Sequence, residues 1–250
     1  MKSSYKTNLS SNQNLQRKMK REFHFIVQAK GGVGKSLHTY LRALSEAGSS
    51  SLFVDLDSST KTSSRQLAFL GQDRFEAFSL LDNRERLMRD LFIGYVESLA
   101  DSPFDKVYMD FGAPESEQLP ALITRDIDLK EWCDELGIEA VFHIIIGGGG
   151  AYLASIQFLE KMRAALRSKF EIVIWQNLFG FNQFPGLSQE LEDNCTALGL
   201  DLRRFGDFEP ASLLGGQILD GIRNGYSLKD YPPGARLRLK KELKENFGDE

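Results

Sequence analysis

A glycine-rich loop close to the N-terminus is compatible with only a few protein folds. Residues 30–36 read Lys-Gly-Gly-Val-Gly-Lys-Ser, after a hydrophobic run at residues 23–29 and before an amphipathic segment at residues 37–47. A strand, a glycine loop and a helix in this order bring backbone N–H groups and a helix N-terminus together, where they bind phosphate oxygens. Glycine suits such a loop because a Cβ would obstruct the close approach of the backbone. The chain is therefore predicted to bind a nucleoside triphosphate.

The end of this loop satisfies the Walker A pattern through Gly34-Lys35-Ser36, although Ala29 stands where the first glycine is usual. We expect Lys35 to neutralise the β and γ phosphates and the Ser36 hydroxyl to ligate Mg²⁺. The loop residues predicted to bind the nucleotide are Gly31, Gly32, Val33, Gly34, Lys35, Ser36 and Leu37.

After the loop, short β-branched or aromatic runs alternate with amphipathic stretches. This alternation is typical of an α/β fold, here a three-layer, doubly wound and mostly parallel sheet with helices on both faces. Strands are expected at residues 23–29, 51–56, 106–110, 140–146, 171–176 and 202–205, and C-terminal helices at 213–222 and after residue 234. Ligands of such sheets lie outside the carboxyl ends of the strands, where Gly, Asp and Asn residues gather in this sequence.

Composition separates the N-terminal leader from the remainder of the chain. The 250 residues are 42% hydrophobic and 26% charged, so residues 22–250 are expected to form a single P-loop domain with one core. Residues 1–21 are basic and carry no acid, within a net charge of −4. We expect this leader to be disordered, the alternative being an arm that contacts nucleic acid or an acidic partner.

Two further features bear on the cellular compartment. No apolar run approaches the length of a membrane span and the N-terminus lacks the apolar core of a secretory signal, so we expect a cytoplasmic protein. Cys133 and Cys195 are far apart and have no metal-ligand spacing, and we expect both to be free core thiols. His24, His38 and His143 fall on separate predicted elements and receive no role.

A second lysine, Lys30, precedes the glycines, and the whole run Lys-Gly-Gly-Val-Gly-Lys-Ser resembles the deviant Walker A box of the ParA/MinD family, in the SIMIBI class of P-loop proteins. The resemblance implies an ATPase in which Lys30 reaches across a nucleotide-sandwich homodimer to the partner's phosphates. It also implies that Asp57, in Val54-Asp55-Leu56-Asp57, helps to position the attacking water; a turn acid is the alternative for Asp57.

The resemblance extends to three later strand ends. Asp110, at the end of Val107-Tyr108-Met109-Asp110, is similar to a Walker B aspartate and is expected to hold Mg²⁺ through water. Asn177 and Asp207 match positions that contact the base in this superfamily, although Asn177 as a plain turn residue stays open. The Asn/Thr-Lys-x-Asp signature of related GTPases is missing at Asn177, so ATP is expected rather than GTP.

Two segments depart from the family pattern. Ser58-Ser59-Thr60 replace the Pro and Gln that many partition ATPases have after the second acid, which affects the control of hydrolysis. Gly147 to Gly150 have no common counterpart; a flexible βα loop is favoured over a loop whose backbone comes near a partner or ligand. Basic runs at residues 161–169 and 236–244 are either solvated helix faces or sites for DNA phosphates.

Taken together, these features predict a ParA-like ATPase that dimerises on ATP with Mg²⁺, and then binds DNA without sequence preference, a small adaptor protein, or both. It would act in plasmid segregation or cargo positioning, with possible nucleoid association, and slow hydrolysis would reset it. Membrane binding ranks lower, because the apolar side of the last helix is narrow. The alternatives are a nucleotide-gated adaptor for a conjugation or transport complex, with little hydrolysis, and a metabolic or redox enzyme on the same scaffold.

Overall fold

The computed structural model describes residues 20–57 and 62–248. A seven-stranded sheet forms its centre, in the order β3-β2-β4-β1-β5-β6-β7, and every pairing is parallel. The strands are β1 (Arg21–Val27), β2 (Ser51–Asp55), β3 (Phe75–Ala77), β4 (Lys106–Asp110), β5 (Ile138–Ile146), β6 (Glu171–Asn177) and β7 (Asp201–Phe205). The chain starts in the middle of the sheet and builds outward on both sides of β1, which is the doubly wound arrangement that the sequence predicts.

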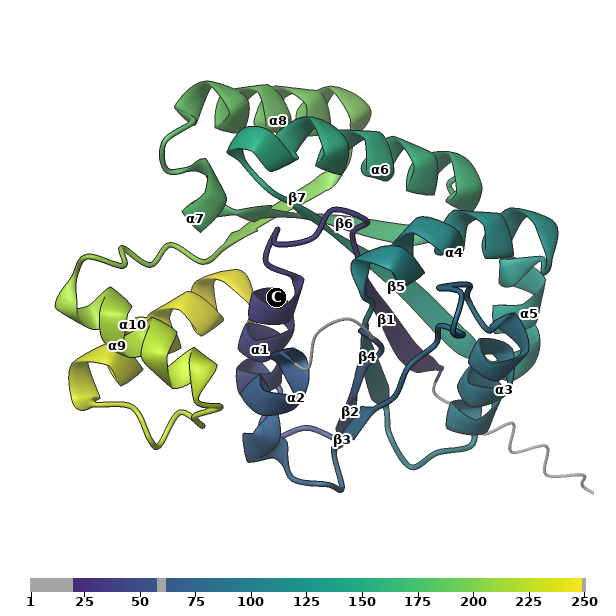
Figure 1. The fold of residues 1–250 in the computed structure, drawn as a ribbon, viewed down its shortest axis with the longest axis horizontal. Coiled ribbons are helices and arrows are strands. Elements are labelled where there is room, and N and C mark those ends of the chain that lie inside the picture. The colour runs from purple at the N-terminus through teal and green to yellow at the C-terminus, as the bar shows by residue number, and fades with distance from the viewer. Residues whose placement is uncertain (1–19, 58–61, 249–250) are drawn as a thin grey trace, which may run out of the picture.

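Helices cover both faces of the sheet (Figure 1). One face carries α1 (Lys35–Ser45), α9 (Leu213–Arg223) and α10 (Pro233–Asn246), with the short α2 (Thr62–Gln66) beside α1. The other carries α3 (Arg89–Ala100), α4 (Ala113–Arg125), α5 (Leu129–Leu136), α6 (Tyr152–Leu166) and α8 (Pro185–Leu198). The remaining turns are α7 (Leu178–Phe181) and the 3₁₀ segments η1 (Ala68–Leu70) and η2 (Gly149–Ala151).

Alternation along β1 divides the core into two layers. Phe23, Phe25 and Val27 pack toward α3 to α6, in a layer that is almost entirely apolar. Ile26 packs toward α1, α9 and α10, in a layer that is rich in aromatic side chains. Successive side chains of a strand point to opposite faces, so a buried strand with helices on both sides reads as a continuous apolar run.

The predicted three-layer α/β architecture is confirmed, with small differences at the ends of elements. The chain leaves the sheet after Val27, two residues earlier than expected, because Gln28 and Ala29 already turn into the phosphate loop. Arg21, assigned to the leader, begins β1 and donates to the carbonyls of Ala100 and Ser102. The three-residue edge strand β3 was not expected, and residues 1–19 of the leader lie outside the described residues.

Candidate nucleotide site

The phosphate loop lies between the carboxyl end of β1 and the N-terminus of α1 (Figure 1). Gly32 and Gly34 adopt left-handed φ angles of 76° and 107°, which other residues rarely adopt. A Cβ at Gly31 or Gly32 would meet no atom within 4 Å, so the outer surface of the loop is open. The N-terminus of α1 receives no side-chain cap and has no acid in its first turn, so its N–H groups are available to an anion.

Lys35 is buried at the start of α1, and its Nζ donates to the carbonyl oxygen of Gln28 at 2.9 Å. Burial lowers the pKa of Lys35, whereas the carboxylates of Asp110, Asp57 and Glu115 act in the opposite direction. The lysine therefore lies at the start of α1 among three acids, from the ends of β2 and β4 and from the first turn of α4.

Gln28 belongs to no motif that the sequence reveals, yet it connects the phosphate loop to the sheet. Its side-chain amide donates to the carbonyl of Ile145 at 2.8 Å, and its Oε1 accepts the backbone N–H of Lys30 at 3.2 Å. It thereby joins the phosphate loop to β5. The Lys30 side chain itself is exposed.

Asp55 and Asp110 are register partners at the ends of the adjacent strands β2 and β4, and both are buried. Asp55 accepts the backbone N–H of Asp57 and both the N–H and the hydroxyl of Ser64, each at 3.1 Å. Burial, with the neighbouring Asp110, raises the pKa of Asp55 to about 7. Two carboxylates held this close are unfavourable unless a cation or proton is shared between them.

Asp57 lies beside Gly112, two residues after the end of β4. A Cβ at Gly112 would lie 3.0 Å from Asp57 Oδ1 and 2.1 Å from Glu115 Oε2, so both carboxylates crowd this position and would have to move to admit a side chain. Glu115 is fully buried in the first turn of α4, where the helix N-terminus favours a negative charge. Sequence reasoning missed Glu115, whose only signal is its place one turn beyond Gly112.

Asn177 and Asp207 end up in different surroundings. Asn177 is buried behind the phosphate loop and donates from Nδ2 to the carbonyl of Val33 at 2.8 Å. Its Oδ1 is buried and has no hydrogen-bond partner among residues 20–57 and 62–248. Asp207 is exposed and contacts Arg238 of α10 through its backbone carbonyl at 2.6 Å. Both stay candidate base contacts.

The glycine run after β5 is closely packed rather than open. A Cβ at Gly148 would lie 2.1 Å from the carbonyl oxygen of Gly180, and one at Gly147 would lie 2.9 Å from Val33 of the phosphate loop. Gly150 meets nothing within 4 Å. Gly147 and Gly148 therefore pack against other segments of the same chain, which the sequence did not predict.

Three histidines that are distant in the sequence meet between α1 and the sheet: His24 of β1, His38 of α1 and His143 of β5. We call these histidines, with Trp175, the histidine cluster. The Trp175 ring N–H donates to His143 Nδ1 at 2.9 Å, and His143 Nε2 lies 2.9 Å from His24 Nδ1. Because Trp175 can only donate, a neutral His143 carries its proton on Nε2 and donates to His24. His38 is fully buried, and neither ring nitrogen has a partner among the described residues. Burial lowers the pKa of all three histidines, and that of His38 and His143 falls well below the usual value.

The remaining predictions concern residues outside the phosphate loop. Cys133 and Cys195 are buried free thiols, as expected. Ser58-Ser59-Thr60 lie outside the described residues. No helix in residues 20–57 or 62–248 is both long and apolar enough to cross a membrane. In the same residues no group of three or more His, Cys, Asp or Glu is arranged to hold a metal by itself.

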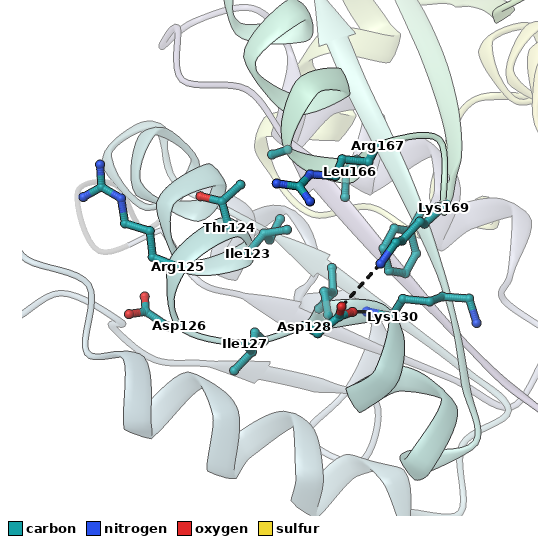
Figure 2. Close-up of a pocket in the computed structure, with 13 residues that line it drawn as sticks. Ile123, Thr124, Arg125, Asp126, Ile127, Asp128, Lys130, Leu166, Arg167 and Lys169 are labelled. Carbon is teal, nitrogen blue, oxygen red and sulfur yellow. Dashed lines mark hydrogen bonds and ion pairs between the residues drawn. The ribbon is translucent and has the colours of Figure 1, made fainter.

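A cavity of about 280 Å³ lies between the α4–α5 connection and the turn after α6, at the opposite end of the sheet from the phosphate loop. Figure 2 shows Lys169 at this cavity reaching the carboxylate of Asp128, with which it pairs at 3.3 Å. None of the predicted nucleotide-binding residues lines the cavity. Arg167 and Lys169, from the first basic run, do line it.

The residues present fit a nucleotide and Mg²⁺. Mg²⁺ binds hard oxygen ligands and usually keeps several waters. Such oxygens are present in the Ser36 hydroxyl, in the first turn of α1, and in the carboxylates of Asp55 and Asp110, at the ends of β2 and β4. The uncapped N-terminus of α1 and the left-handed glycines form an anion cradle. The architecture and the phosphate loop together are those of an α/β P-loop NTPase fold.

Comparisons with known proteins agree with this class. The fold is similar to that of MinD in the MinC:MinD cell division protein complex of Aquifex aeolicus, with a TM-score of 0.56 and 15% identity over 92% of this chain and 97% of that chain. It is also similar to MinD of Pyrococcus horikoshii complexed with Mg-ADP, with a TM-score of 0.50 and 17% identity over 90% and 96% of the two chains. A protein of Borrelia burgdorferi B31 described as a plasmid partition protein, bound to AMPPNP, gives a TM-score of 0.50 and 14% identity over 90% and 99%.

Similarity in sequence to known proteins is weaker than similarity in fold. No family model matches the chain. Two proteins of Escherichia coli, both named Protein TraL, are 26% identical to it over 174 residues, which cover 62% of this chain and 63% of each relative. The chain thus spans less than two thirds of the length of these curated relatives.

Proposed function

We propose that this chain is a ParA-like ATPase. It binds ATP with Mg²⁺ and forms a homodimer around the nucleotide, and in that state it binds DNA or a small adaptor protein to position a plasmid or other cargo in the cytoplasm. The observation that carries this proposal is the pair of lysines on one loop. Lys35 is buried among acids and Lys30 is exposed. A buried lysine suits the protomer's own phosphates, and an exposed one suits those of a partner.

Each residue of the site has its own role in hydrolysis, set by its position and its charge. Lys35 exchanges the Gln28 carbonyl for phosphate oxygens, and Lys30 adds positive charge from the second protomer. Ser36 and Asp110 would hold Mg²⁺, which when bound neutralises phosphate charge. Asp57 orients the attacking water. Such groups act mainly by electrostatic stabilisation, because phosphoryl transfer needs little covalent help from the protein.

Two kinds of support come from the relatives. Solved structures with this fold hold AMPPNP or Mg-ADP, which agrees with a nucleotide and Mg²⁺ in this chain. One of them is described as a plasmid partition protein and one contains MinC as a partner of MinD.

A nucleotide-gated adaptor with little hydrolysis is the second candidate, and the basic surface favours it. Several cations of the two basic runs are engaged by acids: Lys161 with Glu117 at 2.8 Å, Lys169 with Asp128 at 3.3 Å, and Lys241 with Glu245 at 3.7 Å. Paired cations release fewer counterions from DNA, which weakens binding to phosphates. The redox alternative finds no support, since both cysteines are buried thiols.

DNA retention with ATP and with ADP, at low and at high salt, tests the proposal. We expect retention with ATP that is lost at high salt, because phosphate contacts alone would supply it. Equal retention with both nucleotides would contradict a nucleotide switch. Phosphate release separates the two candidates: turnover that stays at background with DNA present favours the adaptor.

A further inference from the structure

The C-terminal helix α10 meets the loop that follows β7, beside the nucleotide site. On this helix Glu242 is 1% exposed, although three neighbouring positions on the same helix are exposed lysines. A buried carboxylate is costly unless it is hydrogen-bonded and paired. Glu242 is both: its Oε1 accepts the backbone N–H of Gly206 at 2.8 Å, and its Oε2 lies 3.3 Å from Arg238.

Arg238 continues this contact to the next residue of the loop. Its Nη2 donates to the backbone carbonyl of Asp207 at 2.6 Å and lies 3.4 Å from the Asp207 carboxylate. Its guanidinium also lies 5.7 Å from the centre of the Phe208 ring. A guanidinium has several donors in a fixed plane, so one Arg can hold a backbone carbonyl and two carboxylates at once. Arg238 and Glu242 therefore hold two consecutive residues of the loop, Gly206 and Asp207.

The loop that they hold is packed against the phosphate loop. Gly206 has a φ of 80°, and a Cβ there would lie 3.0 Å from Asn177 Oδ1 and 3.5 Å from Leu37 of α1. Asn177 in turn donates to Val33. A displacement of Gly206 would therefore change the space around the buried, unpartnered Asn177 Oδ1.

We propose that Arg238 and Glu242 are positioning residues that hold Gly206 and Asp207 where they read the base of the bound nucleotide. This inference rests on the proposed function. Two oxygen acceptors lie at this place: the Asn177 amide oxygen at the end of β6 and the Asp207 carboxylate on the loop. Acceptors suit the exocyclic amino group of adenine, whereas guanine presents a carbonyl at the equivalent place. The C-terminal helix thus sets the discrimination between bases without touching the phosphates.

Base selectivity distinguishes this role from simple stabilisation of the fold. The variants are Arg238→Met and Glu242→Gln, with matched controls that remove an exposed arginine and an exposed glutamate elsewhere: Arg223→Met and Glu245→Gln. For each protein, the dissociation constants of ATP, GTP and inorganic tripolyphosphate are measured in Mg²⁺ by calorimetry, and folding is checked by a thermal melt.

We expect Arg238→Met and Glu242→Gln to bind ATP about tenfold more weakly and to discriminate less between ATP and GTP. Tripolyphosphate, which has no base, is expected to bind as it does to the wild type, and the controls are expected to match the wild type for all three ligands. If Glu242→Gln does not fold, the more exposed Arg238 still gives the result.

Equal losses for ATP and tripolyphosphate would overturn the inference, and so would an Arg238→Met protein with unchanged selectivity. A wild-type protein that binds ATP and tripolyphosphate equally well would also overturn it, while leaving the phosphate loop intact. A wild-type protein that binds none of the three ligands would instead refute the proposed function, and this inference with it.

Discussion

Two buried polar groups of this molecule can be compared: the histidine cluster under α1, and the acids around Lys35 at the carboxyl ends of β2 and β4. The histidine cluster is joined by its own hydrogen bonds, from Trp175 to His143 and from His143 to His24. The acids also accept hydrogen bonds, but the pKa of Asp55 rises to about 7 because Asp55 is buried near Asp110. Burial alone therefore does not mark a site. Like charges held together at strand ends do, because they are unfavourable until a ligand arrives.

Replacing Lys35 should give the largest effect on ATP binding. If it did not, the acids around Lys35 would not differ from the histidine cluster in having a ligand. Lys35→Ala is expected to weaken ATP binding by about 100-fold or more, because a charge-assisted contact to phosphate is lost. Calorimetric titration with ATP and Mg²⁺ measures this. Unchanged affinity in a folded variant would mean that the acids around Lys35 serve the fold only.

In the histidine cluster, by contrast, we expect an effect on stability alone. His143→Leu leaves the Trp175 N–H and His24 Nδ1 without their partner and should lower the free energy of unfolding by about 2 kcal/mol. His38→Leu is the matched control, since His38 makes no hydrogen bond within the described residues. It should cost little or stabilise the fold. Urea unfolding gives both values, and equal losses would contradict the bonding pattern.

Acid should act on the histidine cluster as well. The folded-state pKa values of these histidines lie below the unfolded value of 6.5, so the unfolded state binds more protons at lower pH. The contribution of these histidines to stability should therefore be constant above about pH 6.5 and fall below it, by about 1.4 kcal/mol per pH unit for each histidine, while Asp55, with its pKa raised to about 7, acts with the opposite sign in the same range. Removing His38 should reduce the slope of the free energy of unfolding against pH by the amount that corresponds to one bound proton. An identical slope in the His38→Leu variant would contradict this assignment.

Asp55→Asn should give the smallest and the most informative change. Removing one of two crowded carboxylates is expected to stabilise the nucleotide-free protein by about 1 kcal/mol at pH 8, a figure reduced for screening by water at the open end of the site. The same change should weaken binding of ATP with Mg²⁺. Thermal melts with and without nucleotide show both effects. Destabilisation of the nucleotide-free protein would mean that the hydrogen bonds to Ser64 outweigh the repulsion.

The parts of the fold that were predictable from the sequence have strong local patterns. The long β-branched strands and the glycine loop are read from neighbouring residues alone, and the loop fixes Lys35 and Ser36 at the start of a helix. The edge strand Phe75–Ala77 was missed because it is short and mostly exposed, and shows no apolar alternation. The contacts of Asn177 and Asp207 with a nucleotide base stay proposals, because no sequence pattern identifies the ligand of Asn177.

Contacts between distant segments were not predictable from the sequence. His24 and His143 meet only because β1 and β5 are neighbours in one particular register. Gly148 and Gly180 approach each other across two connections that sequence spacing does not relate. Glu115 turns back to Gly112 and Asp57 only once α4 is in place, so its burial could not be read from an ordinary helical pattern.

Sedimentation of the wild type and of Lys30→Ala, each with a non-hydrolysable ATP analogue and with ADP, tests the central claim most directly. We predict that the wild type is a dimer with the analogue and a monomer with ADP. Lys30→Ala should bind the analogue and stay monomeric, because its own Lys35 is intact and only the contact to the partner's phosphates is lost. Wild type and variant that sediment alike with the analogue would contradict the cross-dimer role of Lys30 and, with it, the proposal that this chain is a nucleotide-sandwich ATPase.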